Sequence, residues 1–111
     1  MIQKEKRLTT EEVKGLFSIK KTLHSNYFTL IYNQDMSGPK FAVIVSKKVS
    51  PKAVYRNKVR RYIYAEIAKI IAKKPLKTGH FAINVKTNTR GVDTVLIKED
   101  LALLLSKVVN K

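Results

Sequence analysis

Hydrophobic and polar positions recur with two different periods along this 111-residue chain. Near its start, Val13, Leu16 and Phe17 share one face of a helix, which we predict over residues 9–18. Farther along, apolar residues recur at every second position, as is typical of strands. These strands are predicted at residues 27–32, 41–46 and 80–86. Because only the turn-forming segment 33–39 separates the first two strands, we expect them to pair antiparallel with each other.

Two longer helices complete the pattern. Ser50 followed by Pro51 indicates a cap and a first helical position, and the helix that they open extends to about Lys73, with Pro75 just beyond it. The last helix is predicted from about Lys98 to Val109, on an apolar stripe of Leu101, Leu104, Leu105 and Val108. The order αββαβα predicts an α/β fold, an α+β sandwich in which a mixed sheet carries helices on one face. The length predicts a single domain over residues 1–111.

The predicted sheet has two unlike faces, since side chains alternate along each strand. One face is bulky and apolar, and we expect it to form the core beneath the long helices: Phe28, Leu30, Tyr32, Phe41, Val43, Val45, Phe81, Ile83 and Val85. The other face is smaller and more polar: Tyr27, Thr29, Ile31, Ala42, Ile44, Ser46, His80, Ala82, Asn84 and Lys86. It is either an ordinary solvated face or a shallow groove for an extended nucleic-acid strand, with Phe17 and Tyr27 as stacking surfaces and Lys86 as a cation. The residues leave both interpretations open.

Charge changes this picture most. The chain has 23 Lys and Arg against 8 Asp and Glu, a formal net charge of +15, although 44% of its residues are hydrophobic. A folded body with that much like charge favours a polyanionic partner, either a nucleic acid or, as the rival, an anionic membrane surface. No cysteine is present and the amino terminus has no apolar signal region, so we expect a reducing, cytoplasmic location.

The cations gather in one segment, from Lys40 to Arg61. No acidic residue lies between Asp35 and Glu66, so these charges are not diluted as on an ordinary helix surface. In the predicted helix, Arg56, Arg60, Ile63 and Ile67 fall on one line that is cationic first and apolar later. We therefore expect the first turns of the helix to project past the sheet edge. There the free N–H groups at the helix N-terminus and the bidentate guanidinium groups of the arginines can bind phosphates. Structured RNA fits this edge better than duplex DNA, because no helix-turn-helix spacing or zinc-ligand set is present.

Residues for catalysis are not grouped in the sequence. His24 and His80 are isolated, no nucleophile lies beside a base, and the carboxylates are not clustered for a metal. We therefore expect no active site and no protein-bound cofactor or metal in this chain.

The segment SKKVSPKAVYRNKVRRYI, from Ser46 to Ile63, resembles the signature of the protein subunit of bacterial ribonuclease P. The similarity covers nearly the whole chain, with Arg7-Leu8 and a short helix before it and a strand with basic Lys86 after it. This resemblance implies an α/β sandwich like that of a ribosomal-protein domain, with a left-handed βαβ crossover. It also implies a non-catalytic subunit of an endoribonuclease. The RNA subunit would perform the Mg²⁺-dependent removal of the 5′ leader from precursor tRNA.

The resemblance also implies two groups of site residues. Contacts to the catalytic RNA would come from Lys47, Lys48, Lys52, Arg56, Asn57, Lys58, Arg60 and Arg61. Phe17, Ile31 and Lys86 would line a cleft for the leader. Two departures bear on these roles: members of the family often have aromatics at the positions of Val13 and Ile31, so stacking would depend on Phe17 and Tyr27. In addition, Tyr64 occupies the place of a third helical arginine.

Two alternatives remain beside this hypothesis. A small ribosomal or ribosome-associated RNA-binding protein would share the charge, but would not need an open second sheet face. A peripheral membrane protein would have apolar residues opposite its lysines, whereas here Arg56 and Ile63 share one line. The resemblance implies ribonuclease P RNA and precursor tRNA as the partners, and we expect no membrane and no DNA partner.

Overall fold

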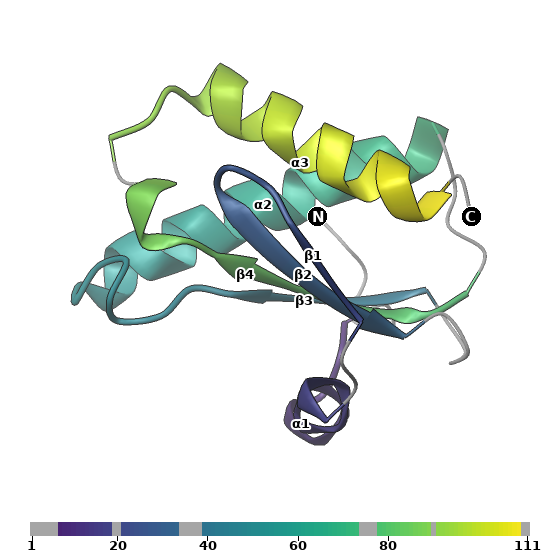
Figure 1. The fold of residues 1–111 in the computed structure, drawn as a ribbon. Helices are drawn as coiled ribbons and strands as arrows, with labels where there is room; N and C mark the ends of the chain where they lie inside the picture. Colours follow the sequence, from purple (N-terminus) through teal and green to yellow (C-terminus); the bar gives the residue numbers. More distant parts are fainter. Residues whose placement is uncertain (1–6, 19–20, 34–38, 74–77, 90, 110–111) are drawn as a thin grey trace.

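A four-stranded sheet with two long helices on one face and one short helix on the other forms the molecule (Figure 1). The structure is a computed structural model, and it describes residues 7–18, 21–33, 39–73, 78–89 and 91–109. In chain order the elements are α1 (Thr10–Phe17), β1 (Thr22–His24), β2 (Phe28–Asn33), β3 (Lys40–Ile44), α2 (Ala53–Lys73), β4 (His80–Val85), the 3₁₀ turn η2 (Thr87–Thr89) and α3 (Thr94–Val109). Residues 34–38 of the predicted turn 33–39 and the predicted helix terminator Pro75 lie outside the described residues.

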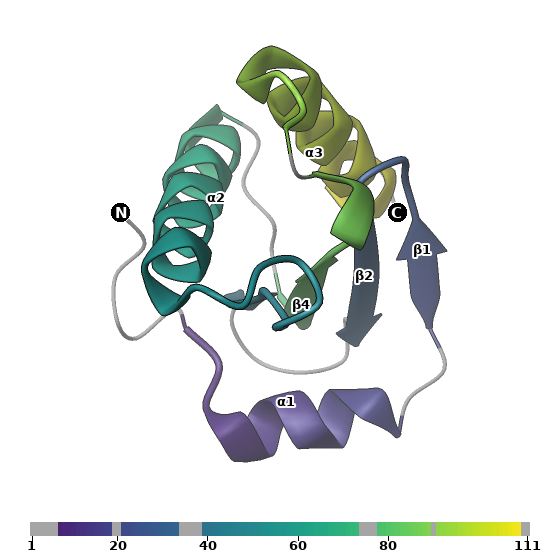
Figure 2. The ribbon, with the colours of Figure 1, turned by 90° about the vertical axis from the view of Figure 1, so that its left-hand side faces the viewer.

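The strand order is β1-β2-β4-β3, so the predicted pairing of β2 with β3 is wrong. β4 lies between them, antiparallel to β2 and parallel to β3. Proximity in sequence favoured a hairpin, but β3 is continued by α2, which crosses the sheet and returns the chain as β4. In Figures 1 and 2 this β3–α2–β4 crossover is left-handed, as the resemblance implied and against the usual preference for right-handed units.

A strand that the sequence pattern did not reveal, β1, pairs antiparallel with β2. It has only three residues, and Leu23 between Thr22 and His24 is its single apolar position. Three residues are too few for an alternating pattern to be recognised, so this strand was not predicted from the sequence. The observed order therefore begins αβββ, whereas the predicted order began αββ.

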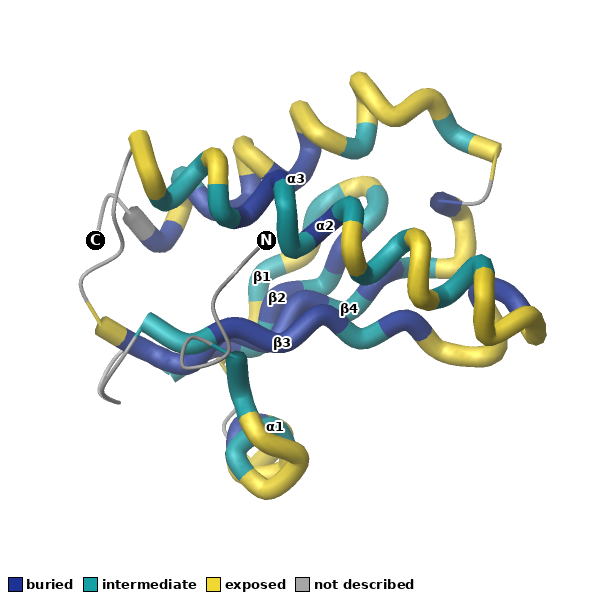
Figure 3. Tube along the Cα trace, turned by 180° about the vertical axis from the view of Figure 1, so that it is seen from behind, coloured by how far each residue is buried: buried dark blue, intermediate teal, exposed yellow. Residues whose placement is uncertain are grey.

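The bulky sheet face forms the core, as predicted. All of its residues in β2, β3 and β4 are buried, together with Val45 just after β3. Ile63 and Ile67 of α2 and Leu101, Leu104 and Leu105 of α3 cover this face and are buried as well. The dark blue stretches in Figure 3 follow this layer between the sheet and the long helices.

The helix α1 lies on the opposite face, so the prediction of helices on one face holds for α2 and α3 only. Its side chain Leu16 is buried, and Thr9 and Glu12 close its first turn as a capping box. Glu12 also forms an ion pair with Lys40 of β3, with Nζ and Oε2 3.2 Å apart. Before α1, the amide of Leu8 donates to the carbonyl of Phe41 (2.8 Å), which joins the amino-terminal segment to the β3 edge.

Two helix starts differ from the predictions. The helix α2 begins at Ala53, and the side chain of Ser50 accepts a hydrogen bond from the Lys52 amide (3.2 Å), so Ser50 orders the loop before the helix. The helix α3 begins at Thr94, four residues before Lys98, because the Asp93 side chain accepts from the Val95 amide (2.9 Å). The predicted start rested on the apolar stripe alone and did not take into account that an aspartate such as Asp93 commonly caps a helix.

Candidate nucleic-acid interface

The loop between β3 and α2 presents three exposed lysines on a buried support. Val49 and Ser50 point into the molecule and are almost fully buried, and the Val49 amide donates to the carbonyl of Ser46 (3.0 Å). The neighbouring residues Lys47, Lys48 and Lys52 are exposed. This alternation of anchored and free residues holds the lysine backbones in place while the ammonium groups remain in solvent.

The first turns of α2 carry the remaining predicted contacts. Lys58, Arg61 and Asn57 are exposed, and Figure 3 shows that exposure is concentrated in this half of the helix and in the loop before it. Arg60 is half-buried and donates to the side chain of Asn57. Arg56 is half-buried too, and its Nη1 donates to the carbonyl of Ser50 (2.9 Å). Arg56 therefore ties the helix to the loop, and its remaining donors are available for another partner.

The change from cationic to apolar along α2 coincides with the edge of the sheet, as predicted. Ile63 and Ile67 are buried in the core, one and two turns after Arg60. The ion pairs among the described residues join Lys40 to Glu12 and Lys69 to Glu66, and the ring of His80 lies 3.6 Å from the Glu12 carboxylate. Consequently, no described carboxylate neutralises the cations of the loop or of the first half of α2. We call this surface the cationic edge: Lys47, Lys48, Lys52, Arg56, Asn57, Lys58, Arg60 and Arg61.

The second face of the sheet is covered at one end and open at the other. Where α1 crosses it, Ala42, His80 and Ala82 are buried. Toward the ends of β3 and β4, Ile44 and Asn84 are only half-buried and Ser46 is exposed. Helix α1 therefore covers one end of this face, and the two interpretations now concern only the open surface at the other end.

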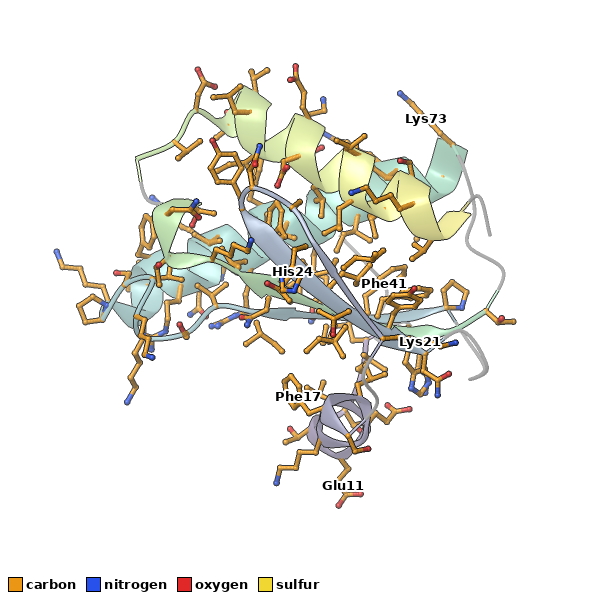
Figure 4. All side chains as sticks on the ribbon, in the orientation of Figure 1. Glu11, Phe17, Lys21, His24, Phe41 and Lys73 are labelled. Atoms are coloured by element: carbon orange, nitrogen blue, oxygen red, sulfur yellow. The ribbon has the colours of Figure 1, made fainter. Side chains whose placement is uncertain are left out.

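The predicted cleft residues lie around this open surface in different ways. Phe17, the last residue of α1, is 53% exposed and lies on the side of the helix that faces the sheet (Figure 4). Ile31 in β2 is half-buried. Tyr27 precedes β2 and packs against the hydrophobic core. Ile31 differs from it, because it is not among the partly buried residues that pack against this core. Phe17 is thus the more accessible of the two aromatic residues predicted for stacking.

A concavity of about 850 Å³ connects the open sheet face with the cationic edge. Its walls include Lys47 and Lys48 from the loop and Asn84 and Lys86 from β4 and the residue after it. One residue of the predicted leader cleft, Lys86, therefore shares this concavity with two of the predicted contacts to the catalytic RNA, Lys47 and Lys48. Asn88, which also lines the concavity, is not among the predicted site residues, because it lies between the last predicted strand and the last predicted helix.

Lys86 also has a structural contact. Its ammonium donates to the carbonyl of Ser25, and the side chain of Asn88 donates to the carbonyl of Asn26 (3.0 Å). From the other side, the buried carboxylate of Asp100 in α3 accepts from the Ser25 hydroxyl (2.7 Å) and from the Tyr27 amide (2.9 Å). The β1–β2 turn is therefore fixed between α3 and β4. An ammonium has three donors, so Lys86 keeps hydrogen-bonding capacity for a ligand.

Groups suited to acid–base or metal chemistry are dispersed. No three His, Cys, Asp or Glu side chains of the described residues come close enough to hold a metal ion. His24 lies beside Thr29, with Nδ1 and Oγ1 3.4 Å apart, and His80 lies 3.6 Å from Glu12.

The hydrogen bond from the Thr9 amide and the contact with Lys40 lower the pKa of Glu12, and burial and nearby Glu66 raise the pKa of Tyr62. Among the described helices, none has the length and apolarity required to span a bilayer.

The fold and this surface define a class: a small basic α/β protein with an unneutralised helix edge next to an open sheet face. Solved structures share the fold. The RNase P protein of Staphylococcus aureus superposes with a TM-score of 0.79 at 20% identity, over 95% of this chain and 98% of that one. The RNase P protein of Thermotoga maritima gives a TM-score of 0.68 at 21% identity, over 95% and 96%.

Sequence comparison identifies the family. The family model described as Ribonuclease P matches residues 2–109. A ribonuclease P protein component of Ureaplasma parvum is 26% identical over 102 residues, which covers 91% of this chain and 88% of the relative. A ribonuclease P protein component of Microcystis aeruginosa is 35% identical over 66 residues, 55% of each chain. The chain belongs to the ribonuclease P protein family, and the resemblance drawn from Ser46 to Ile63 is confirmed.

Proposed function

We propose that this chain is the protein subunit of ribonuclease P and that it binds two RNA segments. The cationic edge would bind the catalytic RNA, and the open sheet face beside Phe17 would bind the 5′ leader of precursor tRNA. The observation that carries the proposal is the concavity shared by Lys47, Lys48 and Lys86, since it connects an unneutralised cationic edge to a face able to accept an extended strand. Two RNA segments can therefore lie side by side on one protein surface.

The chemistry is assigned to the RNA partner in this proposal. The described carboxylates and histidines form no cluster for a metal ion, whereas phosphates of a folded RNA bind Mg²⁺ readily. Mg²⁺ is accordingly expected at the RNA, and the protein contributes no catalytic side chain. A chain without cysteines suits the reducing cytoplasm, which is where we place this activity.

The role of the protein then follows from charge. A precursor tRNA and a catalytic RNA are both polyanions and repel each other, and Mg²⁺ at high concentration screens that repulsion. A protein with a net charge of +15 lowers the same repulsion by binding phosphates of both and releasing their counterions. Its effect on leader cleavage should consequently be largest where Mg²⁺ is scarce.

A reconstitution assay tests this function. The ribonuclease P RNA encoded in the same genome is transcribed, and cleavage of a precursor tRNA is followed with and without the protein over a range of Mg²⁺ concentrations. We expect the protein to restore cleavage at low Mg²⁺ and to have little effect at high Mg²⁺. Absence of stimulation at every Mg²⁺ concentration would overturn the proposal.

Phe17→Ala tests the leader site separately. If the exposed ring stacks on a leader base, its loss should weaken binding of precursor tRNA by ~1–3 kcal/mol and leave binding of mature tRNA unchanged. Leu103→Ala is the matched control, because Leu103 is an equally exposed apolar residue on α3, across the sheet from α1. Equal losses for precursor and mature tRNA would show that Phe17 supports the fold and does not contact the leader.

A further inference from the structure

An arginine outside the helix lies against α2. The guanidinium of Arg7 stacks over the ring of Tyr64, with Cζ 4.9 Å from the ring centroid. Such a cation–π contact favours a fixed orientation of the planar guanidinium. Figure 2 shows the segment that leads into α1 passing below α2, on the side of the molecule where the β3 edge lies. Arg7 thus joins the surface of α2 from a remote part of the sequence.

Both members of the stack are held from behind by strand β3. The hydroxyl of Tyr64 accepts a hydrogen bond from the Val43 amide (3.1 Å). Arg7 forms a parallel bridge with Phe41, and the next amide, that of Leu8, donates to the Phe41 carbonyl (2.8 Å). The outer edge of β3 therefore fixes the ring and the backbone of the arginine independently. The position of the guanidinium is set before any partner arrives.

The positive charge of Arg7 is not neutralised within the described residues. None of the ion pairs formed by described carboxylates includes Arg7. Its Nε is buried without a hydrogen-bond partner, while the side chain as a whole is only half-buried. A ligand from solvent cannot reach the buried Nε, so this atom does not contribute to a binding site. The accessible donors are the terminal nitrogens, which are the ones that form a fork to phosphate.

The location of the stack relates it to the cationic edge. Arg56, Arg60 and Tyr64 follow at intervals of four residues and therefore lie along one ridge of α2. Tyr64 has no charge of its own, but it supports the guanidinium of Arg7 at that third step. The ridge consequently presents three guanidinium groups in succession, two from the helix and one from the amino-terminal segment.

We propose that Arg7, held on Tyr64, is a further phosphate-binding residue of the cationic edge and contacts the RNA that α2 binds. This inference depends on the proposed function. A guanidinium is only weakly hydrated and the stack already covers one of its faces, so transfer from water to a phosphate costs little more desolvation. RNA binding would in turn supply the partner that the described residues do not provide.

The test measures the affinity of the full-length protein for the ribonuclease P RNA transcript as a function of salt concentration. Arg7→Ala should weaken binding about tenfold or more and lower the salt slope by about 1. Tyr64→Phe should keep most of the affinity, because it retains the ring although it removes the hydrogen bond from the Val43 amide. Tyr64→Leu should lose affinity to a similar degree as Arg7→Ala. The double variant Arg7→Ala/Tyr64→Leu should bind no more weakly than Arg7→Ala alone, because both changes remove one interaction.

Two controls separate the possible failures. Arg60→Ala reports on the proposed function itself, and Lys73→Ala removes one exposed cation at the far end of α2, where Figure 4 shows it pointing away from the molecule. If Arg60→Ala weakens binding and Arg7→Ala does not, the role of Arg7 is wrong and the proposed function stands. If neither differs from Lys73→Ala, the proposed function fails as well.

Thermal unfolding of each variant excludes a purely structural effect. A large fall in melting temperature for Arg7→Ala with an unchanged salt slope would overturn the proposal, since it would show a stabilising contact only. If Arg7→Ala does not fold, Arg7→Gln replaces it, because a planar amide can still cover the ring but has no charge. Arg7→Gln should then show the same reduction of slope, and an unchanged slope would overturn the proposal equally.

Discussion

Lysines stand at both ends of strand β3, and their surroundings differ completely. Lys40 at its start is half-buried and pairs with Glu12 of α1, next to the buried ring of His80. Lys47 and Lys48, just beyond its end, are exposed and have no carboxylate partner among the described residues. At the Lys40 end, helix α1 crosses the second face of the sheet and covers it. At the second end the sheet face is open and continues into the concavity.

Net charge by itself therefore does not locate a binding surface. A lysine beside a carboxylate contributes to the fold and has little attraction left for a polyanion, whereas an unpaired lysine on an anchored loop keeps its full charge. The position of one acidic residue, Glu12, makes the two ends of β3 electrostatically different, since it pairs with Lys40 and not with Lys47 or Lys48.

Asp100→Asn should have the largest effect, because the open end has no covering helix and depends on this buried carboxylate to hold the β1–β2 turn. The change would leave donors of Ser25, Asn26 and Tyr27 poorly paired, at a cost of about 2–4 kcal/mol in the free energy of unfolding. Urea denaturation measures it. Glu99→Gln, at the exposed neighbouring position, should cost less than about 0.5 kcal/mol. Equal costs for both would show that Asp100 does not hold the turn.

Lysine substitutions at the two ends should have opposite consequences. Lys47→Ala/Lys48→Ala should lower the salt slope of RNA binding by about 2 and should leave the melting temperature almost unchanged. Lys40→Ala should lower stability slightly, by less than about 1 kcal/mol, and leave the salt slope unchanged. Salt titrations of RNA binding and thermal unfolding of the same samples decide between these outcomes. A slope that responds equally to both ends would refute the distinction between them.

Glu12→Gln should have the smallest effect. Glutamine can still accept from the Thr9 amide in a capping box, so only the charge is removed, at a cost of about 0.5–1 kcal/mol. The fold lowers the pKa of Glu12 below its ordinary value of 4.5, chiefly through the hydrogen bond from the Thr9 amide. Its carboxylate therefore stabilises the protein above that pH, and the contribution is lost as the pH falls through the lower, folded-state pKa.

Unfolding measured between neutral and acid pH tests this titration. The wild-type protein should lose more stability than Glu12→Gln as the pH falls below 4.5. Parallel curves for the two proteins would mean that Glu12 does not stabilise the closed end through its charge.

The core could be predicted from alternation because burial acts on each residue separately. Phe28, Val43 and Ile83 are apolar wherever their strands lie, and all three are buried as expected. The strand pairing could not be predicted in the same way, since β4 bonds to both β2 and β3 through backbone groups that all sequences share. The hairpin expected from the short connection was wrong for that reason.

The cationic edge was similarly predictable, and the contacts that shape it were not. The missing acidic residues and the line from Arg56 to Ile67 are visible in the sequence, and the transition from exposed to buried follows them. In contrast, Lys86 donates to Ser25, whose hydroxyl bonds to Asp100, a partner separated from it by 75 positions. Arg7 and Tyr64 meet only because the amino-terminal segment follows the β3 edge. No local pattern contains such contacts.

The central place of β4 also has a consequence for the order in which the protein can be made. β2 and β3 do not bond to each other, so a growing chain on the ribosome has no closed sheet until Val85 has been added. The lysines and arginines of the cationic edge are translated before that point. The most basic segment is therefore synthesised while only the β1–β2 pairing of the sheet can form, because the two other pairings both require β4. Strand β4 therefore has to be added before the sheet next to the cationic edge can be completed.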